Sequence, residues 1–115
     1  MEVDPSMVEP RVDFYGLHVP PGKSAHIAPQ LLDREGCSVS IHLTQVALGS
    51  EPAAGPLTVF AVRDKSNYAI GTLEKGRCEQ FSVDYMCTTD VAFRHSGQTN
   101  VYLTGYRYRL VQMPL

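Results

Sequence analysis

Eight prolines and nine glycines divide this 115-residue sequence into pieces that are too short for most amphipathic helices. The pieces are rich in valine, tyrosine, phenylalanine, threonine and isoleucine, which favour half-buried β-strands. Short strands separated by regular turn sequences are typical of an all-β, antiparallel sandwich or barrel. The predicted strands are Val12–Val19, Ser24–Ala28, Cys37–Leu48, Leu57–Arg63, Tyr68–Leu73, Cys78–Met86, Val91–Arg94 and Val101–Leu110.

The longest predicted strand changes its buried side halfway along its length. Apolar residues alternate up to Leu43 and resume on the opposite parity at Val46. A β-bulge near Thr44–Gln45 would produce this change, because one extra residue shifts every later side chain to the other face. The large residues of the C-terminal strand also change parity after Gly105, so we expect a second bend there.

The length and composition predict one globular domain at residues 13–111, with a flexible leader at 1–12 and a tail at 112–115. No apolar run approaches the length of a membrane span, so no membrane partner is expected. The net charge is −2, without a cluster of lysine and arginine, which disfavours direct nucleic-acid binding. The three cysteines form no CxxC pair, which indicates reduced thiols packed as small apolar groups.

Residues suited to catalysis or metal binding occur without the spacing that such sites need. The four histidines, at positions 18, 26, 42 and 95, form no HxH or HExxH pattern. We therefore predict no catalytic residue, no metal and no cofactor. A jelly-roll ligand binder of the lectin or cupin type is the least favoured alternative, because it would need paired histidines or an aromatic groove with convergent carboxylates.

Two strands carry candidate residues for an interface between copies of the chain. Tyr102 and Tyr106 share a parity of the last strand, where they either pack across a sheet or contact a neighbouring subunit. The strand Leu57–Val62 is apolar on both parities, so both of its faces should be covered. A neighbouring subunit or a covering loop would satisfy this pattern. The candidate interface residues are Leu57, Phe60, Val62, Tyr102 and Tyr106.

Four segments, in the same order along the chain, resemble the nucleoplasmin-like domain family. They are FYGLHVPPGK at 14–23, IHLTQVALG at 41–49, AIGTL at 69–73 and VYLTGY at 101–106. The pattern is more similar to the nucleoplasmin-like domains of nuclear FKBP prolyl isomerases and plant nucleolar deacetylase-like proteins than to vertebrate nucleoplasmin.

The resemblance implies an eight-stranded jelly-roll β-sandwich that forms a homopentameric ring, sometimes stacked as a decamer. It also implies a nuclear histone chaperone that binds core histones for chromatin assembly. Acidic residues near predicted strand ends would then contact histones electrostatically. These candidates are Glu35, Glu51, Glu74 and Asp90. The alternative function is a structural scaffold that oligomerises a fused nuclear enzyme such as an FKBP prolyl isomerase.

Overall fold

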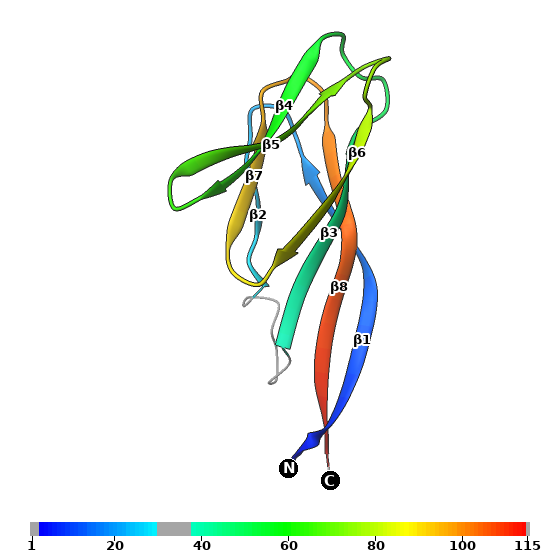
Figure 1. Cartoon of the computed structure of the whole chain (residues 1–115), viewed down its shortest axis with the longest axis vertical. Coiled ribbons are helices and arrows are strands. Elements are labelled where there is room, and N and C mark those ends of the chain that lie inside the picture. The colour runs from blue at the N-terminus through cyan, green and yellow to red at the C-terminus, as the bar shows by residue number, and fades with distance from the viewer. Residues whose placement is uncertain (1–2, 30–37, 115) are drawn as a thin grey trace.

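The computed structural model describes residues 3–29 and 38–114, and these fold into two four-stranded antiparallel sheets packed face to face (Figure 1). Sheet A has the strand order β1-β8-β3-β6, and sheet B has the order β2-β7-β4-β5. This arrangement is a jelly roll, which confirms the predicted fold class. The strands are β1 (Val3–Val19), β2 (Ala25–Ile27), β3 (Ser38–Leu48), β4 (Pro56–Arg63), β5 (Ser66–Glu74), β6 (Gln80–Cys87), β7 (Val91–His95) and β8 (Val101–Pro114).

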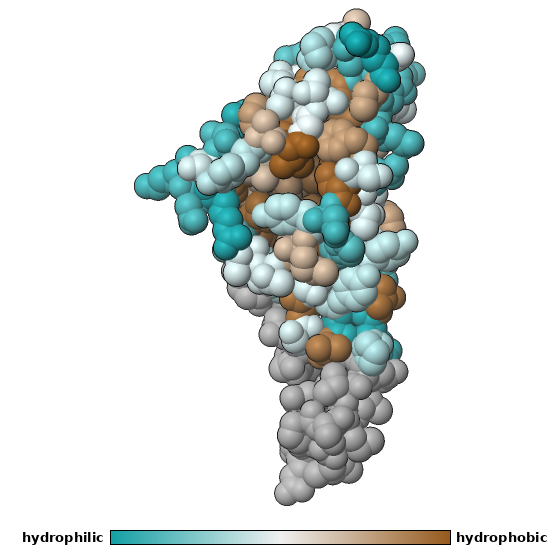
Figure 2. Space-filling model, in the orientation of Figure 1, coloured by the Kyte–Doolittle hydropathy of each residue, from teal (hydrophilic) through white to brown (hydrophobic). Residues whose placement is uncertain are grey.

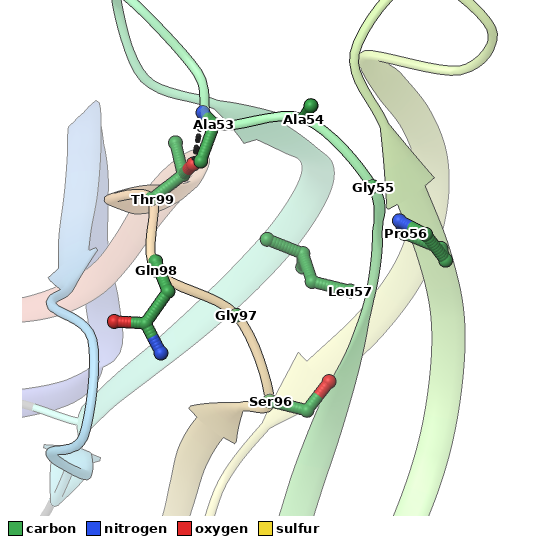
Figure 3. A pocket seen from close by; sticks show the side chains of 9 residues that line it. All are labelled: Ala53, Ala54, Gly55, Pro56, Leu57, Ser96, Gly97, Gln98 and Thr99. Carbon is green, nitrogen blue, oxygen red and sulfur yellow. Dashed lines mark hydrogen bonds between the residues drawn. The ribbon is translucent and has the colours of Figure 1, made fainter.

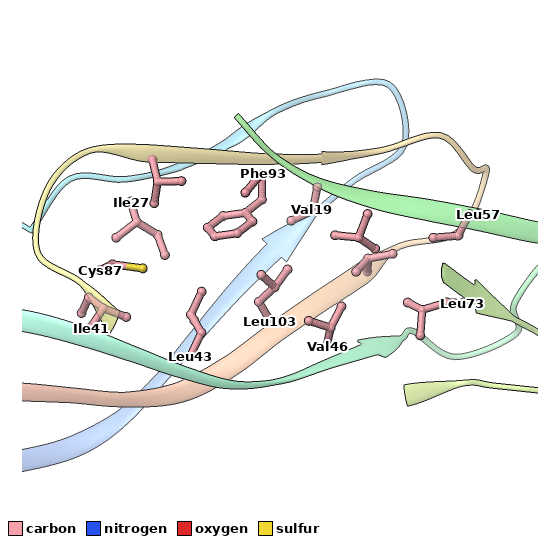
Figure 4. Packing of buried hydrophobic residues seen from close by; sticks show 14 residues of the cluster. Val19, Ile27, Ile41, Leu43, Val46, Leu57, Leu73, Cys87, Phe93 and Leu103 are labelled. Atoms are coloured by element: carbon pink, nitrogen blue, oxygen red, sulfur yellow. The ribbon is translucent and has the colours of Figure 1, made fainter. Parts of the chain in front are cut away.

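The core lies between the inner faces of the two sheets. Phe93 and Ile27 from sheet B lie over Leu43 and Leu103 from sheet A, and all four are buried (Figure 4). The Tyr85 ring packs edge-on against Phe93, with 6.0 Å between the ring centroids. Burial of each such side chain stabilises the fold by about 1.5–3 kcal/mol. Alternating apolar residues thus account for the sandwich without metal or disulfide support among the described residues.

The predicted bulge in β3 is confirmed. The register of β3 shifts between Leu43 and Gln45 against both of its neighbours, β6 and β8. The expected phase change in β8 is wrong, because β8 pairs with β1 without a shift at Gly105. Gly105 instead pairs with Leu43 beside the bulge, where the backbone of His42 approaches it closely. The glycine therefore accommodates a bulge in the neighbouring strand.

The two terminal strands are longer than the sequence pattern predicts. β1 begins at Val3 and pairs with β8 as far as Pro114, so a strand runs through most of the predicted leader. Pro10 interrupts the local strand signal, but it pairs with Leu110 within this ladder. β1 lies at the edge of sheet A, where one side of its backbone faces no strand and the missing N–H of proline is tolerated.

Figure 2 shows the distribution of hydrophilic and apolar residues on one face of the molecule. Hydrophilic residues cover the protruding β4–β5 hairpin, and apolar residues gather where β5 and β6 face each other in Figure 1. Within the described residues, no helix is long and apolar enough to cross a membrane.

His95 is a buried histidine that ties the end of β7 to the end of β1. Its Nδ1 accepts a hydrogen bond from the Gly97 N–H at 3.1 Å, and its Nε2 lies 3.1 Å from the Val19 carbonyl oxygen. This geometry requires the neutral ring with its proton on Nε2. Burial lowers the pKa of His95 below the ordinary value of 6.5, although the hydrogen bond to Val19 opposes the shift.

The folded domain should therefore lose stability in mild acid. The contribution of neutral His95 to the unfolding free energy is complete above pH 6.5 and decreases as the pH falls through 6.5 toward the lower folded-state pKa. One such proton gives a slope of at most about 1.4 kcal/mol per pH unit. Urea unfolding at pH values between 7.5 and 5.5 measures this dependence. The unfolding free energy should decrease less steeply with falling pH for His95→Gln than for wild type. The exposed neighbour His26 is the control, and an equal loss of slope in His26→Gln would contradict the assignment.

Candidate assembly surface

Large apolar side chains are exposed mainly on the outer side of sheet A. Of the seven large apolar side chains that are exposed among the described residues, six lie on this side and Tyr68 lies on β5. We call these six residues the aromatic face. They are Val12, Phe14, Met86, Tyr102, Tyr106 and Leu110.

Cross-strand pairing brings these residues together. Phe14 pairs with Tyr106 across β1 and β8, and His42 pairs with both Tyr106 and Met86. Paired residues of an antiparallel ladder point to the same side, and neighbours along each strand point to opposite sides. Because Leu43 points into the core, these residues point outward.

Two histidines order the side chains around the aromatic face. The His18 ring stacks on Tyr102 with 4.9 Å between centroids, and its Nε2 lies 2.9 Å from Oδ1 of Asn100. The Nε2 of His42 lies 2.6 Å from Oδ1 of Asp84 on the neighbouring strand. These contacts restrict the rings before any partner binds, which reduces the entropy that binding would cost.

The outer side of sheet A carries little formal charge. Among its described outward positions, Asp84 is the acidic residue, and lysine and arginine are absent. Protein interfaces are depleted of charge at their centres and enriched in tyrosine, phenylalanine and methionine. This face therefore has the composition of an interface centre.

The structure separates the interface residues that the sequence predicted. Tyr102 and Tyr106 lie exposed on the aromatic face, whereas Phe60 and Val62 are half-buried on the outer side of sheet B. Leu57, in contrast, points into the protomer core and is 5% exposed. The protomer itself therefore accounts for the apolar pattern of β4. The inner face of this strand is buried in the core, and its outer face, with Phe60 and Val62, is partly covered.

The side chain of Arg94 covers one face of the Phe60 ring. The Arg94 guanidinium lies over the Phe60 ring, 4.4 Å from its centroid, and Arg94 Nε donates a 2.8 Å hydrogen bond to the Asn67 side chain. A cation above an aromatic ring is a favourable arrangement that shields one face of the ring. The outer side of sheet B is therefore less available to a partner than the aromatic face.

The predicted histone-binding acids do not form one cluster. Glu74 pairs with Pro56 at one end of β4, whereas Asp90 precedes the β7 residues that pair near the opposite end of β4. Glu51 is exposed in the β3–β4 loop. The Oε1 atom of Glu74 lies 3.8 Å from the Nη1 atom of Arg77. Glu35 lies outside the described residues.

A small pocket lies at one end of the sandwich between the β3–β4 and β7–β8 loops (Figure 3). Its volume is about 180 Å³, and the Ala53 N–H donates a 2.8 Å hydrogen bond to Thr99 Oγ1 across it. Its lining contains no charged side chain and no cysteine or histidine. Ser96 and Thr99 bring hydroxyl groups to the pocket, but none of its lining residues carries a side chain that could serve them as a general base.

The cysteines differ in environment. Burial raises the pKa of Cys87 to about 12, so this thiol stays protonated as a small apolar group of the core. Cys78 is exposed, so the expectation of buried thiols is wrong at that position. Cys37 lies outside the described residues. The described residues contain no group of three histidine, cysteine, aspartate or glutamate side chains that could hold a metal ion.

Sequence reasoning missed four residues of the aromatic face. Val12 and Phe14 were placed on a strand, but alternation alone did not show that β1 lies beside β8. Met86 and Leu110 stood at predicted strand ends, where exposure is common. The parity that Tyr102 shares with Leu110 was the available signal, because β8 keeps its phase along its whole length.

The fold and this face define a jelly-roll domain that presents one aromatic, nearly uncharged sheet surface to its surroundings. The chain belongs to the nucleoplasmin-like domain family, whose model matches residues 14–108. The resemblance seen in the four sequence segments is therefore confirmed.

Similar proteins agree with this assignment. The chain is 28% identical over 97 residues to histone deacetylase HDT3 of Zea mays, covering 84% of this chain and 30% of that protein. It is 33% identical over 96 residues to the 46 kDa FK506-binding nuclear protein of Spodoptera frugiperda, covering 81% and 21%. The chain thus spans about a third or less of these relatives. The solved Drosophila NLP-core has the same fold, with a TM-score of 0.67, 20% identity, and coverage of 83% of this chain and 97% of that one.

Proposed function

We propose that this domain assembles into a homopentameric ring and binds core histones for chromatin assembly in the nucleus. The observation that carries the proposal is the aromatic face on a nucleoplasmin-like fold. The solved structure of the Drosophila NLP-core concerns pentamer formation and histone binding by that protein. The nuclear location follows a relative that is named as a nuclear FK506-binding protein.

In a ring of subunits, the aromatic face of each subunit would contact the neighbouring subunit. Large apolar patches on a soluble surface mark interaction sites, because exposing them to water is unfavourable. In a ring, each subunit uses two different surfaces, one for each neighbour. The aromatic face supplies one surface, and the outer side of sheet B, with Phe60 and Val62, supplies the other. Each contact should bury more than roughly 1,000 Å² in total.

The ring would attract histones through its net charge. Each chain carries −2, so five chains carry about −10 on one particle. Such a field speeds the encounter with basic proteins, and salt screens it beyond roughly 8 Å at physiological ionic strength. The domain itself has no catalytic role in this proposal, and binding should be micromolar or weaker and should fade toward roughly 0.5 M salt.

Histone binding tests this function. Labelled core-histone complexes should bind wild type more tightly than a variant with Glu35, Glu51, Glu74 and Asp90 each replaced by lysine. Light scattering should show the same number of chains in both proteins, so that the loss reports charge rather than assembly. Equal binding by both proteins would contradict the electrostatic account.

The scaffold function is the second candidate, because the similar proteins are about three or more times longer than this chain and one of them is named a histone deacetylase. A ring that binds no histone in either form would favour the scaffold over the chaperone. The enzyme would then belong to a part of the protein outside this domain.

A further inference from the structure

Two side chains of opposite charge lie back to back on the outer sides of the two sheets. In the core, the Tyr85 ring of β6 packs against the Phe93 ring of β7, with 6.0 Å between their centroids. Neighbouring residues of a strand point to opposite sides, so Asp84 points outward from sheet A and Arg94 points outward from sheet B. The carboxylate and the guanidinium therefore lie on opposite sides of the same part of the sandwich.

Few other charged side chains lie on either outer side. Asp84 is the acidic residue at the described outward positions of sheet A, where lysine and arginine are absent. Arg94 is the only lysine or arginine at the outward strand positions of sheet B, all of which the structure describes. The acidic residue on that side, Glu74, lies at the end of β5 beside Arg77. The central parts of the two outer sides are thus complementary in charge.

Each of the two charged groups is oriented by its own protomer and remains available to a partner. Nε2 of His42 lies 2.6 Å from Oδ1 of Asp84, whose side chain is 92% exposed. Arg94 lies over the Phe60 ring and donates from Nε to Asn67, whereas its terminal nitrogens have no hydrogen-bond partner among the described residues. Groups that are ordered before binding lose less entropy when a partner arrives.

A closed ring brings such back-to-back groups together. Each subunit of a ring is related to the next by a rotation without a shift along the axis. Two places that lie back to back on one subunit, at the same height along the axis and the same distance from it, therefore face each other across every contact. We propose that Asp84 of each subunit binds Arg94 of the next, and that this ion pair determines that the copies join head to tail. The proposal rests on the proposed ring and identifies residues that specify its geometry.

The ion pair supplies specificity more than affinity. The aromatic face could also bury its apolar side chains against the same face of a second copy, which would give a two-fold dimer instead of a ring. In that dimer both Asp84 carboxylates would be covered, and no lysine or arginine of the described face could pair with them, which costs free energy. Unpaired charges of this kind suppress wrong partners. Arg94 disfavours a dimer through the outer side of sheet B in the same way.

Charge-swap variants test the pair, with particle mass from light scattering coupled to gel filtration as the measurement. Asp84→Arg and Arg94→Glu should each reduce the particle from about five chains to one or two, because like charges would meet at every contact. The double variant Asp84→Arg/Arg94→Glu reverses the pair and should restore the wild-type mass. Circular dichroism should match wild type in every variant.

The matched control is the double variant Asp84→Arg/Arg63→Glu, which has the same net charge as the restoring variant. Arg63 is exposed at the end of β4, and it pairs with Ser66 on the parity that points away from the outer side of sheet B. This variant should remain dissociated. Restoration of the wild-type mass by the control would overturn the proposal, because net charge rather than one contact would then govern assembly.

Failure of the ion pair and failure of the ring give different results. A wild type of about five chains whose double variant Asp84→Arg/Arg94→Glu stays dissociated would overturn the pair and leave the ring in place. Single variants with the wild-type mass would do the same. A wild type that is monomeric at micromolar concentration would overturn both proposals.

Discussion

Tyr106→Glu is expected to convert the assembled protein from about five chains per particle to single chains. Tyr106 pairs with Phe14 on the aromatic face, and the two side chains are 47% and 72% exposed in the protomer. In a ring this position would be covered, and a carboxylate placed there would lose its water without gaining a partner. Light scattering coupled to gel filtration at micromolar concentration measures the change directly.

Tyr68→Glu is the matched control, since Tyr68 is 59% exposed but lies on β5, away from the aromatic face. It should leave the mass unchanged. Phe60→Glu and Val62→Glu test the outer side of sheet B and should dissociate the ring if that side contacts the next subunit. A monomeric wild type would contradict the ring. A Tyr106→Glu variant with the same particle mass as wild type would show that the aromatic face is not a contact between subunits.

Gly105→Ala is expected to cause the largest loss of folding stability among glycine-to-alanine changes at the glycines that the structure describes. An added Cβ would collide with the carbonyl oxygen of His42 and lie 2.9 Å from both the His42 carbonyl carbon and the Leu43 Cα. These atoms are backbone at the β3 bulge, so they can move only if the β3–β8 ladder moves. We expect destabilisation of about 3 kcal/mol or more, at the upper end of the range for overpacking.

Gly16→Ala is the control for this effect. Gly16 pairs with Thr104, the residue beside Gly105, and its added Cβ would meet only the Phe14 ring at 3.3 Å. That ring is exposed and can turn aside, so the loss should be small. Thermal unfolding at one protein concentration should separate the two variants by roughly 10 °C or more. Equal melting temperatures would show that the close backbone approach at Gly105 is not maintained in solution.

The number of strands and their succession along the chain could be predicted because their signals are local. Turn residues, β-branched residues and alternation each act within a few positions, and the bulge near Thr44–Gln45 was visible as a change of parity. The ends of β1 and β8 could not be predicted, since Pro5 and Pro10 read as strand breakers. The edge position of β1 accommodates Pro10, and Pro5 lies within the register irregularity between Val3 and Val8.

The candidate interface could be predicted only in part. Tyr102 and Tyr106 stood out by composition and parity, and the structure leaves both exposed. Leu57 carried the same apolar signal as Phe60, yet one is buried in the core and the other lies under Arg94. Alternation shows that residues of opposite parity on a strand point to opposite faces of the sheet, but it does not show which face packs against the other sheet.

The sequence by itself determined an all-β sandwich, the bulge in its long strand and its resemblance to nucleoplasmin-like domains, because these depend on residue type and short spacing. Tertiary structure alone decided that residues as far apart as Phe14, Met86 and Tyr106 form one exposed face. It also decided that Arg11 and Arg109 oppose each other beyond the end of sheet B. Which side chains meet, and which remain uncovered, depends on strand order and on where one sheet ends above the other, and neither is encoded in any single stretch of the chain.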